Sequence, residues 1–130
     1  MRILVAGANG QIGWELSKGG AQPGLDILTL DRAALDIADS TAVDRTVKDT
    51  KPSLVVNAAA YTTVDRAESE PELAFVANGN GPANLASPCA KAGIPLIPIS
   101  TDYVLDGHKN NPYFETDPVA PLSVYGKNKA

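Results

Sequence analysis

The chain has 130 residues, of which 44% are hydrophobic and 20% are charged, and its formal net charge at pH 7 is −4. This length suits one domain with a sizeable buried core, and the composition is that of an ordinary globular protein rather than a disordered or fibrous one. The acidic balance, without basic clusters, argues against a nucleic-acid partner. The longest apolar runs fall far short of the roughly 20 residues of a transmembrane helix, so no membrane association is expected.

The chain contains one cysteine, Cys89, and one histidine, His108. A lone cysteine excludes an internal disulfide framework, and these residues lack the spacing of metal ligands, so we predict no metal site in this sequence. The amino terminus lacks the long apolar stretch and cleavage site of a secretory signal. Together these features predict a cytoplasmic protein in which Cys89 is a small packed thiol.

Four short apolar runs with helical patterns between them set the predicted fold. The runs are residues 2–7, 25–31, 53–60 and 94–100. They lack the polar alternation of half-exposed strands, which is typical of strands buried on both faces. The helical patterns are residues 10–20, which close on Gly19 and Gly20, residues 39–49, and residues 70–92. This order predicts an α/β fold with a doubly wound, Rossmann-like parallel sheet.

The last helical pattern carries prolines with different consequences. Pro71 suits a first helical turn, whereas Pro88 falls in the interior, where proline costs about 3 kcal/mol and bends the helix. Beyond the fourth strand, residues 100–121 are rich in Asp, Gly, Asn and Pro and predict a long loop. In this fold class ligands bind beyond the carboxyl ends of the strands, so the loop is a candidate binding element.

Gly7, Gly10 and Gly13 follow the first predicted strand with the spacing G-x-x-G-x-x-G. In a strand-turn-helix setting this spacing favours a diphosphate held on the N–H groups of the helix amino terminus. A tight turn without a ligand is the alternative. Asp31 ends the second strand, where it could bind an adenosine ribose or merely cap the strand, and the neighbouring Arg32 could pair with a 2′-phosphate. The pair leaves NAD and NADP both open.

Three further segments could carry chemistry at the carboxyl ends of later strands. The alanines of residues 57–60 could admit a flat ligand or make room for a helix, and residues 100–104, "STDYV", could serve a ligand or form a polar turn. Tyr125 and Lys129 are four residues apart, on one face of a helix that begins near Ser123. A nearby ammonium favours the phenolate and lowers a tyrosine pKa from its usual value near 10.

These segments together resemble the extended short-chain dehydrogenase/reductase family. The resemblance is carried by the glycine motif, "DRAALDI", "VVNAAAYTTVDRAESEPE", "PISTDYVLDG" and "TDPVAPLSVYGKNK", in order along the whole chain. More narrowly, the chain is similar to NAD(P)-dependent reductases of nucleotide-linked 4-keto-6-deoxy sugars. The resemblance implies NADP(H) or NAD(H) as cofactor and a nucleotide-sugar substrate.

By this resemblance, Tyr125 would give a proton to the 4-keto oxygen, Thr101 would hydrogen-bond that oxygen, and Lys129 would hold the nicotinamide ribose and lower the tyrosine pKa. The residues implied to contact the cofactor are Gly7, Asn9, Gly10, Gln11, Ile12 and Gly13 at the diphosphate, Asp31 and Arg32 at the adenosine ribose, Asp36 and Ile37 at the adenine, Ala58, Ala59 and Ala60 at its middle, and Tyr125 and Lys129. The residues implied to lie near the substrate are Thr62, Val64, Asp102 and Tyr103.

Two other functions stay open within the same family. A non-catalytic dinucleotide-binding regulatory subunit would share the fold, although Thr101, Tyr125 and Lys129 favour an enzyme. A nucleotide-sugar epimerase or dehydratase is the second alternative. Dehydratases usually carry Asp-Glu after the threonine, whereas Tyr103 follows Asp102 here, which disfavours a dehydratase.

Members of the resembled family are considerably longer than this chain. The resemblance therefore implies that residues 1–130 are an amino-terminal dinucleotide-binding domain, truncated before the last strands and the substrate domain, where any magnesium site would lie. Such a chain is expected to bind dinucleotide without turnover. An unpaired fourth strand could also drive self-association, so a homo-oligomer stays open.

Overall fold

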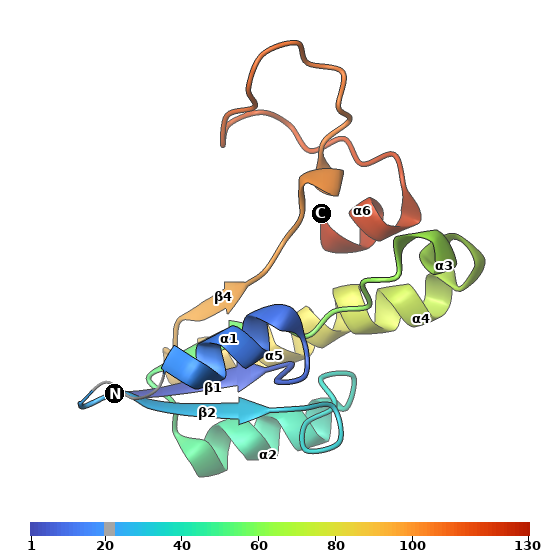
Figure 1. Cartoon of the computed structure of the whole chain (residues 1–130). Helices are drawn as coiled ribbons and strands as arrows, with labels where there is room; N and C mark the ends of the chain where they lie inside the picture. Colours follow the sequence, from blue (N-terminus) through green and yellow to red (C-terminus); the bar gives the residue numbers. More distant parts are fainter. Residues whose placement is uncertain (20–22) are drawn as a thin grey trace.

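The computed structural model of the protein describes residues 1–19 and 23–130. Its centre is a parallel sheet of four strands in the order β2-β1-β3-β4 (Figure 1). The strands are β1 (Arg2–Ala6), β2 (Asp26–Leu30), β3 (Leu54–Asn57) and β4 (Leu96–Pro98). The predicted Rossmann-like parallel sheet is confirmed, with each strand shorter than the apolar run that predicted it.

Helices cover both faces of the sheet. Helix α1 (Gln11–Lys18) lies on one face, and α2 (Ser40–Thr50) and α5 (Gly81–Ala92) pack together on the other (Figure 1). Asp39 caps α2 by accepting the N–H groups of Thr41 and Ala42 at 2.9 and 3.0 Å, as its position before the helix predicts. Helix α1 ends at Lys18 with Gly19 as its C-cap. Gly20, the other glycine expected to close it, lies outside the described residues.

The main core lies between the sheet and the pair α2 and α5. Because side chains alternate along a strand, Leu4 and Ala6 of β1 and Val55 of β3 point to this side. They meet side chains from the facing helices, which are Val43, Val47, Leu85 and Cys89, and each of these residues is 3% exposed or less. Burial raises the pKa of the Cys89 thiol. The thiol is therefore a packing group, as expected.

The single long helix expected over residues 70–92 is interrupted. It consists of α4 (Pro71–Phe75), a π-helical segment (Val76–Asn80) and α5. A π-helical turn carries an extra residue and often marks a functional position. Here it turns Asn78 inward, where the residue is 3% exposed. Pro71 begins α4 as predicted, and Pro88 is accommodated inside α5.

A short helix between β3 and α4 was not expected from the sequence. Helix α3 (Val64–Ser69) has only six residues and lies in a polar stretch without a clear apolar period. The strand before it also stops earlier than expected. The Asn57 side chain accepts the N–H of Ala59 at 3.1 Å, and this local bond turns the chain out of the sheet.

After β4 the chain leaves the sheet and runs to a separate group of elements (Figure 1). A 3-10 turn (Asp102–Val104) begins the predicted long loop, which returns to helix α6 (Val124–Lys129). Ser123 caps α6 by accepting the N–H of Gly126 at 3.0 Å, so the helix begins where the sequence predicted. Within the described residues, no helix has both the length and the apolar character needed to cross a bilayer.

Candidate active site

The three glycines after β1 have different structural roles. Gly7 has a φ of +95°, and a Cβ there would lie 2.6 Å from the backbone nitrogen of Ala59. A Cβ on Gly13 would overlap the carbonyl oxygen of Gly7 and lie 2.8 Å from its carbonyl carbon. At Gly10 the nearest described atom would be 3.4 Å away, which is ordinary van der Waals contact. The packing of the turn explains Gly7 and Gly13, whereas the chain itself leaves room for a Cβ at Gly10.

Gly10 is also the N-cap of α1, and among the described residues no side chain caps this helix end. The first N–H groups of a helix have no partner within the helix and attract anions. The expected diphosphate contacts Asn9, Gln11 and Ile12 adjoin Gly10, and all three side chains are exposed. An uncapped helix end beside a glycine that the fold does not require suits the close approach of a diphosphate.

Asp31 caps the turn that follows β2, which is one of the two roles that the sequence left open. One carboxylate oxygen accepts the N–H of Ala34 at 2.9 Å, which is a turn cap, and the other accepts the Asn9 amide at 3.4 Å. The carboxylate thus adjoins the glycine turn. Arg32 pairs with Asp36 at 3.3 Å, yet its side chain is 87% exposed. Ile37, expected at the adenine, is instead buried in the main core, so its side chain does not face the surface.

Ala58 and Ala59 lie against the glycine turn. A Cβ added to Gly7 would overlap the backbone of Ala59 and would also lie 2.7 Å from the carbonyl carbon of Ala58. The absence of a side chain at Gly7 therefore lets two backbone segments meet at the carboxyl ends of β1 and β3. Ala60 follows them and is half-buried. The site expected for the middle of the cofactor is thus continuous with the site expected for its diphosphate.

Thr101 and the residues after it form the 3-10 turn beyond β4. The Thr101 hydroxyl accepts the N–H of Tyr103 at 3.3 Å and donates to Asp102 at 3.1 Å. The ring of Tyr103 meets the ring of Tyr125 edge-on, with centroids 5.8 Å apart. A Cβ on Gly126 would overlap the carbonyl oxygen of Tyr103. Helix α6 therefore packs directly on the turn that carries Thr101.

Lys129 connects the other end of α6 to the carboxyl end of β4. Its ammonium donates to the carbonyl oxygen of Ile99 at 2.7 Å, and the Ser100 hydroxyl donates to the Lys129 carbonyl oxygen at 3.3 Å. Partial burial lowers the pKa of the Lys129 ammonium. Tyr125 is 8% exposed and packs with Ala67 of α3. The three residues expected to be catalytic, Thr101, Tyr125 and Lys129, thus lie in one group of elements.

The residues expected near the substrate lie around the same elements. Asp102 and Tyr103 line a hollow of about 510 Å³ with Leu122 and Ser123 at the start of α6. Val64 packs into the small cluster that holds Tyr125, and Thr62 is exposed just before α3. Within the described residues, no group of three or more His, Cys, Asp and Glu side chains could hold a metal ion.

Over residues 1–130 the sequence matches the family described as RmlD substrate binding domain. The chain belongs to this family. A dTDP-4-dehydrorhamnose reductase from Sinorhizobium fredii (strain NBRC 101917 / NGR234) is 48% identical over 129 residues, which are 99% of this chain and 43% of the relative. The resemblance read from the sequence motifs is confirmed.

Two solved structures have nearly the same backbone. A dTDP-4-dehydrorhamnose reductase from Clostridium acetobutylicum superposes with a TM-score of 0.96 at 42% identity, over 99% of this chain and 46% of that chain. The Bacillus anthracis dTDP-4-dehydrorhamnose reductase in complex with NADP gives 0.95 at 38% identity, over 98% of this chain and 46% of that chain. The RmlD-family chain described here therefore spans less than half the length of these relatives.

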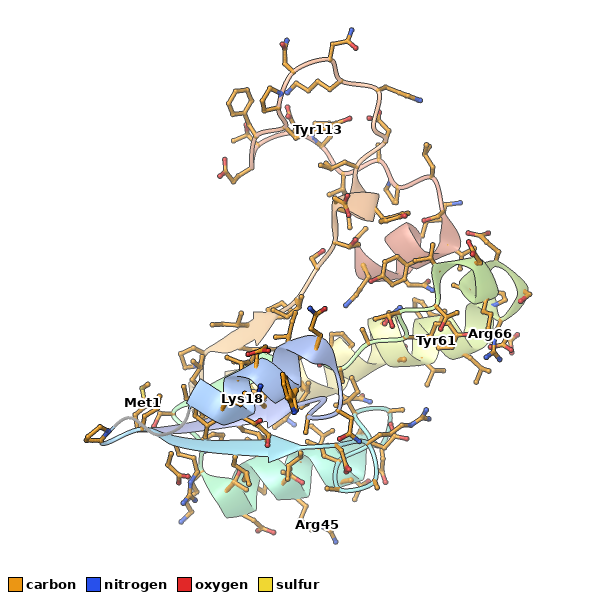
Figure 2. The ribbon with its side chains drawn as sticks, viewed as in Figure 1. Met1, Lys18, Arg45, Tyr61, Arg66 and Tyr113 are labelled. Atoms are coloured by element: carbon orange, nitrogen blue, oxygen red, sulfur yellow. The ribbon has the colours of Figure 1, made fainter. Side chains whose placement is uncertain are left out.

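Two sets of hydrogen bonds near the elements of this site were not predicted from the sequence. The Asn78 side chain accepts the N–H of Tyr61 at 2.8 Å and donates to the Tyr61 carbonyl oxygen at 3.0 Å. Tyr61 in turn donates its hydroxyl to Glu70 at 2.6 Å, and Arg66 donates to the same carboxylate at 2.6 Å. Figure 2 shows the Tyr61 and Arg66 side chains near each other. The only sequence signal was the "NGNG" stretch (78–81), which is unusual inside a helical pattern.

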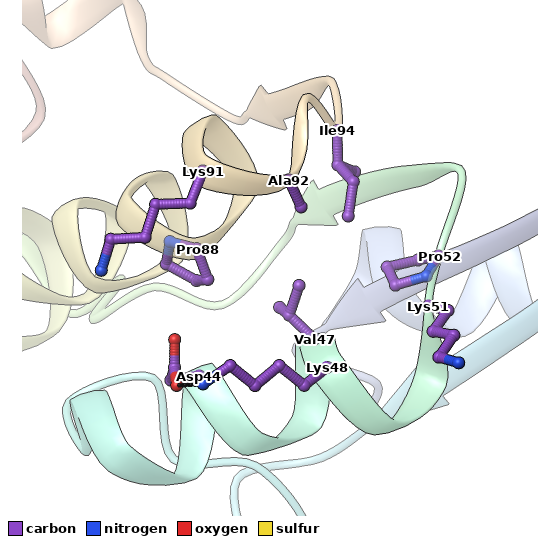
Figure 3. Close-up of a pocket in the computed structure, with 9 residues that line it drawn as sticks. All are labelled: Asp44, Val47, Lys48, Lys51, Pro52, Pro88, Lys91, Ala92 and Ile94. Atoms are coloured by element: carbon purple, nitrogen blue, oxygen red, sulfur yellow. Dashed lines mark hydrogen bonds and ion pairs between the residues drawn. The ribbon is translucent and has the colours of Figure 1, made fainter.

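A groove between α2 and α5 lies away from this site (Figure 3). It encloses about 490 Å³ and includes Pro52 and Ile94, which precede β3 and β4 and so lie at the opposite end of the sheet from the glycine turn. Lys48 and Lys91 on its rim belong to the last turns of their helices. Cations there complement the negative ends of the helix dipoles, which explains their placement without a ligand.

Proposed function

We propose that residues 1–130 are the dinucleotide-binding domain of an NAD(P)H-dependent reductase. Its substrate would be a dTDP-linked 4-keto-6-deoxy sugar, and its product would serve dTDP-L-rhamnose synthesis. The observation that carries the proposal is the packing of α6, which brings Tyr125 and Lys129 against residues 99–103 at the carboxyl end of β4. The high identity to dTDP-4-dehydrorhamnose reductases supports the same substrate class.

The glycine turn suits the diphosphate of a nicotinamide dinucleotide. Gly10 leaves space that the fold does not need, and the adjacent N–H groups of α1 lack a side-chain cap among the described residues. Asp31 adjoins this turn and can accept hydrogen bonds from the adenosine ribose. The bound nicotinamide would supply a hydride to the substrate carbonyl carbon.

The residues on α6 and the 3-10 turn would handle the proton. Tyr125 would donate its phenolic proton to the 4-keto oxygen as the hydride reaches the carbon, and Thr101 would hydrogen-bond the same oxygen. Lys129 would hold the nicotinamide ribose, and its positive charge would favour the phenolate that remains. Asp102, Tyr103, Thr62 and Val64 would border the sugar nucleotide.

We propose that the domain prefers NADP(H) and also binds NAD(H). The exposed Arg32 guanidinium is held near Asp36 by a 3.3 Å ion pair at the adenosine end of the site. An exposed guanidinium can bind a 2′-phosphate through paired hydrogen bonds, whereas Asp31 serves the ribose hydroxyls of NAD. The Bacillus anthracis relative in complex with NADP supports this preference.

A chimera tests the proposal directly. Residues 1–130 replace the matched 43% of the Sinorhizobium fredii reductase, and turnover is followed as NADPH consumption with dTDP-4-dehydrorhamnose. We expect turnover that Tyr125→Phe abolishes while NADPH affinity persists. A regulatory dinucleotide-binding subunit predicts the opposite result, with NADPH binding but no turnover in the unsubstituted chimera. An epimerase would interconvert sugar nucleotides without net NADPH consumption.

A further inference from the structure

Glu68 of α3 is bonded to the first residue of α6. The backbone N–H of Val124 donates to a carboxylate oxygen of Glu68 at 2.8 Å, across a sequence separation of 56 residues. Val124 immediately precedes Tyr125. The function proposed above assigns Glu68 no role, because the residue touches neither the expected cofactor site nor the expected catalytic side chains.

Helix α6 depends on such external ties. It has six residues, whereas isolated helices shorter than about 12 residues are marginal in water. Ser123 satisfies one N–H group of its first turn from within the segment, and Lys129 ties its last turn to Ile99. The bond from Val124 to Glu68 joins the amino end of α6 to another helix. Without it, the amino end keeps only its own cap and side-chain packing.

The charge of Glu68 suits this position. A carboxylate at a helix amino terminus interacts favourably with the helix dipole, and a hydrogen bond to an ionised acceptor is shorter and stronger than a neutral one. Glu68 is exposed, so solvent weakens this attraction. The bond from Val124 to Glu68 is therefore expected to add little to the stability of the fold. Its main effect is to fix the orientation of the amino end of α6.

Helix α3 can serve as a firm support because it is itself held on two sides. Arg66 shares the Glu70 carboxylate with Tyr61. Asn78 holds the Tyr61 backbone through the two bonds described above. On its inner side, Ala67 packs in the cluster that contains Tyr125. One helix thus contacts both the backbone that precedes Tyr125 and the tyrosine ring.

We propose that Glu68 is a positioning residue for the helix that carries Tyr125 and Lys129. It fixes the amino end of α6 so that the Tyr125 phenol stays aligned with Thr101. This role rests on the proposed reductase function. Because a misplacement of about 1 Å can reduce turnover by roughly a hundredfold, the loss of this one bond is expected to affect turnover more than folding.

The test compares Glu68→Ala with Glu68→Gln in the chimera. Gln keeps an oxygen that can accept the Val124 N–H, whereas Ala removes the acceptor. We expect kcat to fall by about tenfold in Glu68→Ala and by no more than about twofold in Glu68→Gln, with the Kd for NADPH within about twofold in both. Glu72→Ala is the matched control, since Glu72 is an exposed carboxylate of α4 without a hydrogen bond among the described residues. Equal kcat in Glu68→Ala and Glu72→Ala would overturn the proposal.

A second measurement does not depend on catalysis. In the 130-residue chain, the amide resonance of Val124 should shift and the α6 amides should exchange faster with solvent in Glu68→Ala, while Glu68→Gln retains wild-type protection. Unchanged exchange in Glu68→Ala would refute the positioning role even if the chimera were active. Conversely, if the chimera had no turnover while the 130-residue chain still showed the exchange difference, the reductase function would be refuted and the bond from Glu68 to α6 would remain established.

Discussion

The glycine turn and the α6 region are built in different ways. The turn is fixed by adjacent backbone, because Gly7 lies against Ala59 just beyond β3 and Gly13 of α1 lies against Gly7, so that close backbone packing determines its shape. Helix α6 is instead held by a small apolar cluster around Tyr125 and by contacts from distant segments, including Glu68, Tyr103 and Ile99. A region with few ties opens at lower free energy than a packed core. Substitutions in the two regions should therefore separate cofactor binding from turnover.

The largest effect is expected from Gly126→Ala in the chimera. The new Cβ would overlap the Tyr103 carbonyl oxygen and lie 3.0 Å from a side-chain carbon of Pro121, so α6 must move off the 3-10 turn. We expect kcat to fall by about a hundredfold or more, and the Kd for NADPH to rise far less, because the diphosphate and adenosine contacts lie outside α6. Lys127→Ala, at the next and exposed position, is the control. Turnover at the wild-type level in Gly126→Ala would show that α6 does not need this contact.

Gly10→Val should produce the reverse pattern. A Cβ at Gly10 would lie 3.4 Å from the Gly7 carbonyl oxygen, which is ordinary contact, so we expect the urea midpoint to stay close to that of the wild type. The β-branched side chain would occupy the space expected for the diphosphate, and NADPH affinity should fall by about tenfold to a hundredfold, measured by titration of the 130-residue chain.

Gly13→Ala completes this comparison. Its Cβ would strike backbone that cannot move easily, and overpacking of this kind costs about 1–3 kcal/mol of the free energy of unfolding. If Gly10→Val lost stability to the same extent as Gly13→Ala, the turn would be a packing motif, and its assignment to a cofactor would fail.

The same difference explains which features the sequence predicted. Strands β1 to β4 were predicted because their apolar runs are local and continuous. The start of α6 was predicted because Ser123 is a local cap. The break in the helix over residues 70–92 was missed because Asn78 turns inward to bind Tyr61, 17 residues away. Glu68 was missed for the same reason, since its partner is 56 residues away.

Ile37 shows that a resemblance does not give the direction of a side chain. It was expected at the adenine, but its side chain lies under Gly81, where an added Cβ would be 2.5 Å from the Ile37 Cδ1 atom. The side chain belongs to the main core. A sequence motif places the backbone of such a residue near a ligand, whereas tertiary packing decides where the side chain points.

Arg32→Ala sharpens the assignment within the cofactor region. Only NADPH offers a 2′-phosphate to the exposed guanidinium, so its affinity should fall by about tenfold while NADH affinity changes by less than about twofold. The measurement is parallel titration with both dinucleotides, with Arg45→Ala, an exposed arginine of α2, as control. Equal losses for both would remove Arg32 from the site.

The smallest effect concerns the support beneath α6 and appears as a pH dependence. The Tyr61 hydroxyl, and then the Arg66 guanidinium, lower the pKa of Glu70 from 4.5. Because the folded pKa lies below the unfolded one, the resulting stability is fully present above the unfolded value and is lost as pH falls through the folded value. Tyr61→Phe removes the larger cause. The urea midpoint of the variant should therefore decline less than that of the wild type between about pH 7 and about pH 3.

Tyr113→Phe, which removes a similar tyrosine-to-aspartate bond in the loop, is the matched control. Relative to the intrinsic exchange rate at each pH, the protection of the α6 amides should fall with acidification in the wild type and already be lower in Tyr61→Phe at neutral pH. Identical pH profiles in the wild type and Tyr61→Phe would mean that the Glu70 network does not stabilise α3, and α3 would then be held by its other contacts, including the packing of Ala67.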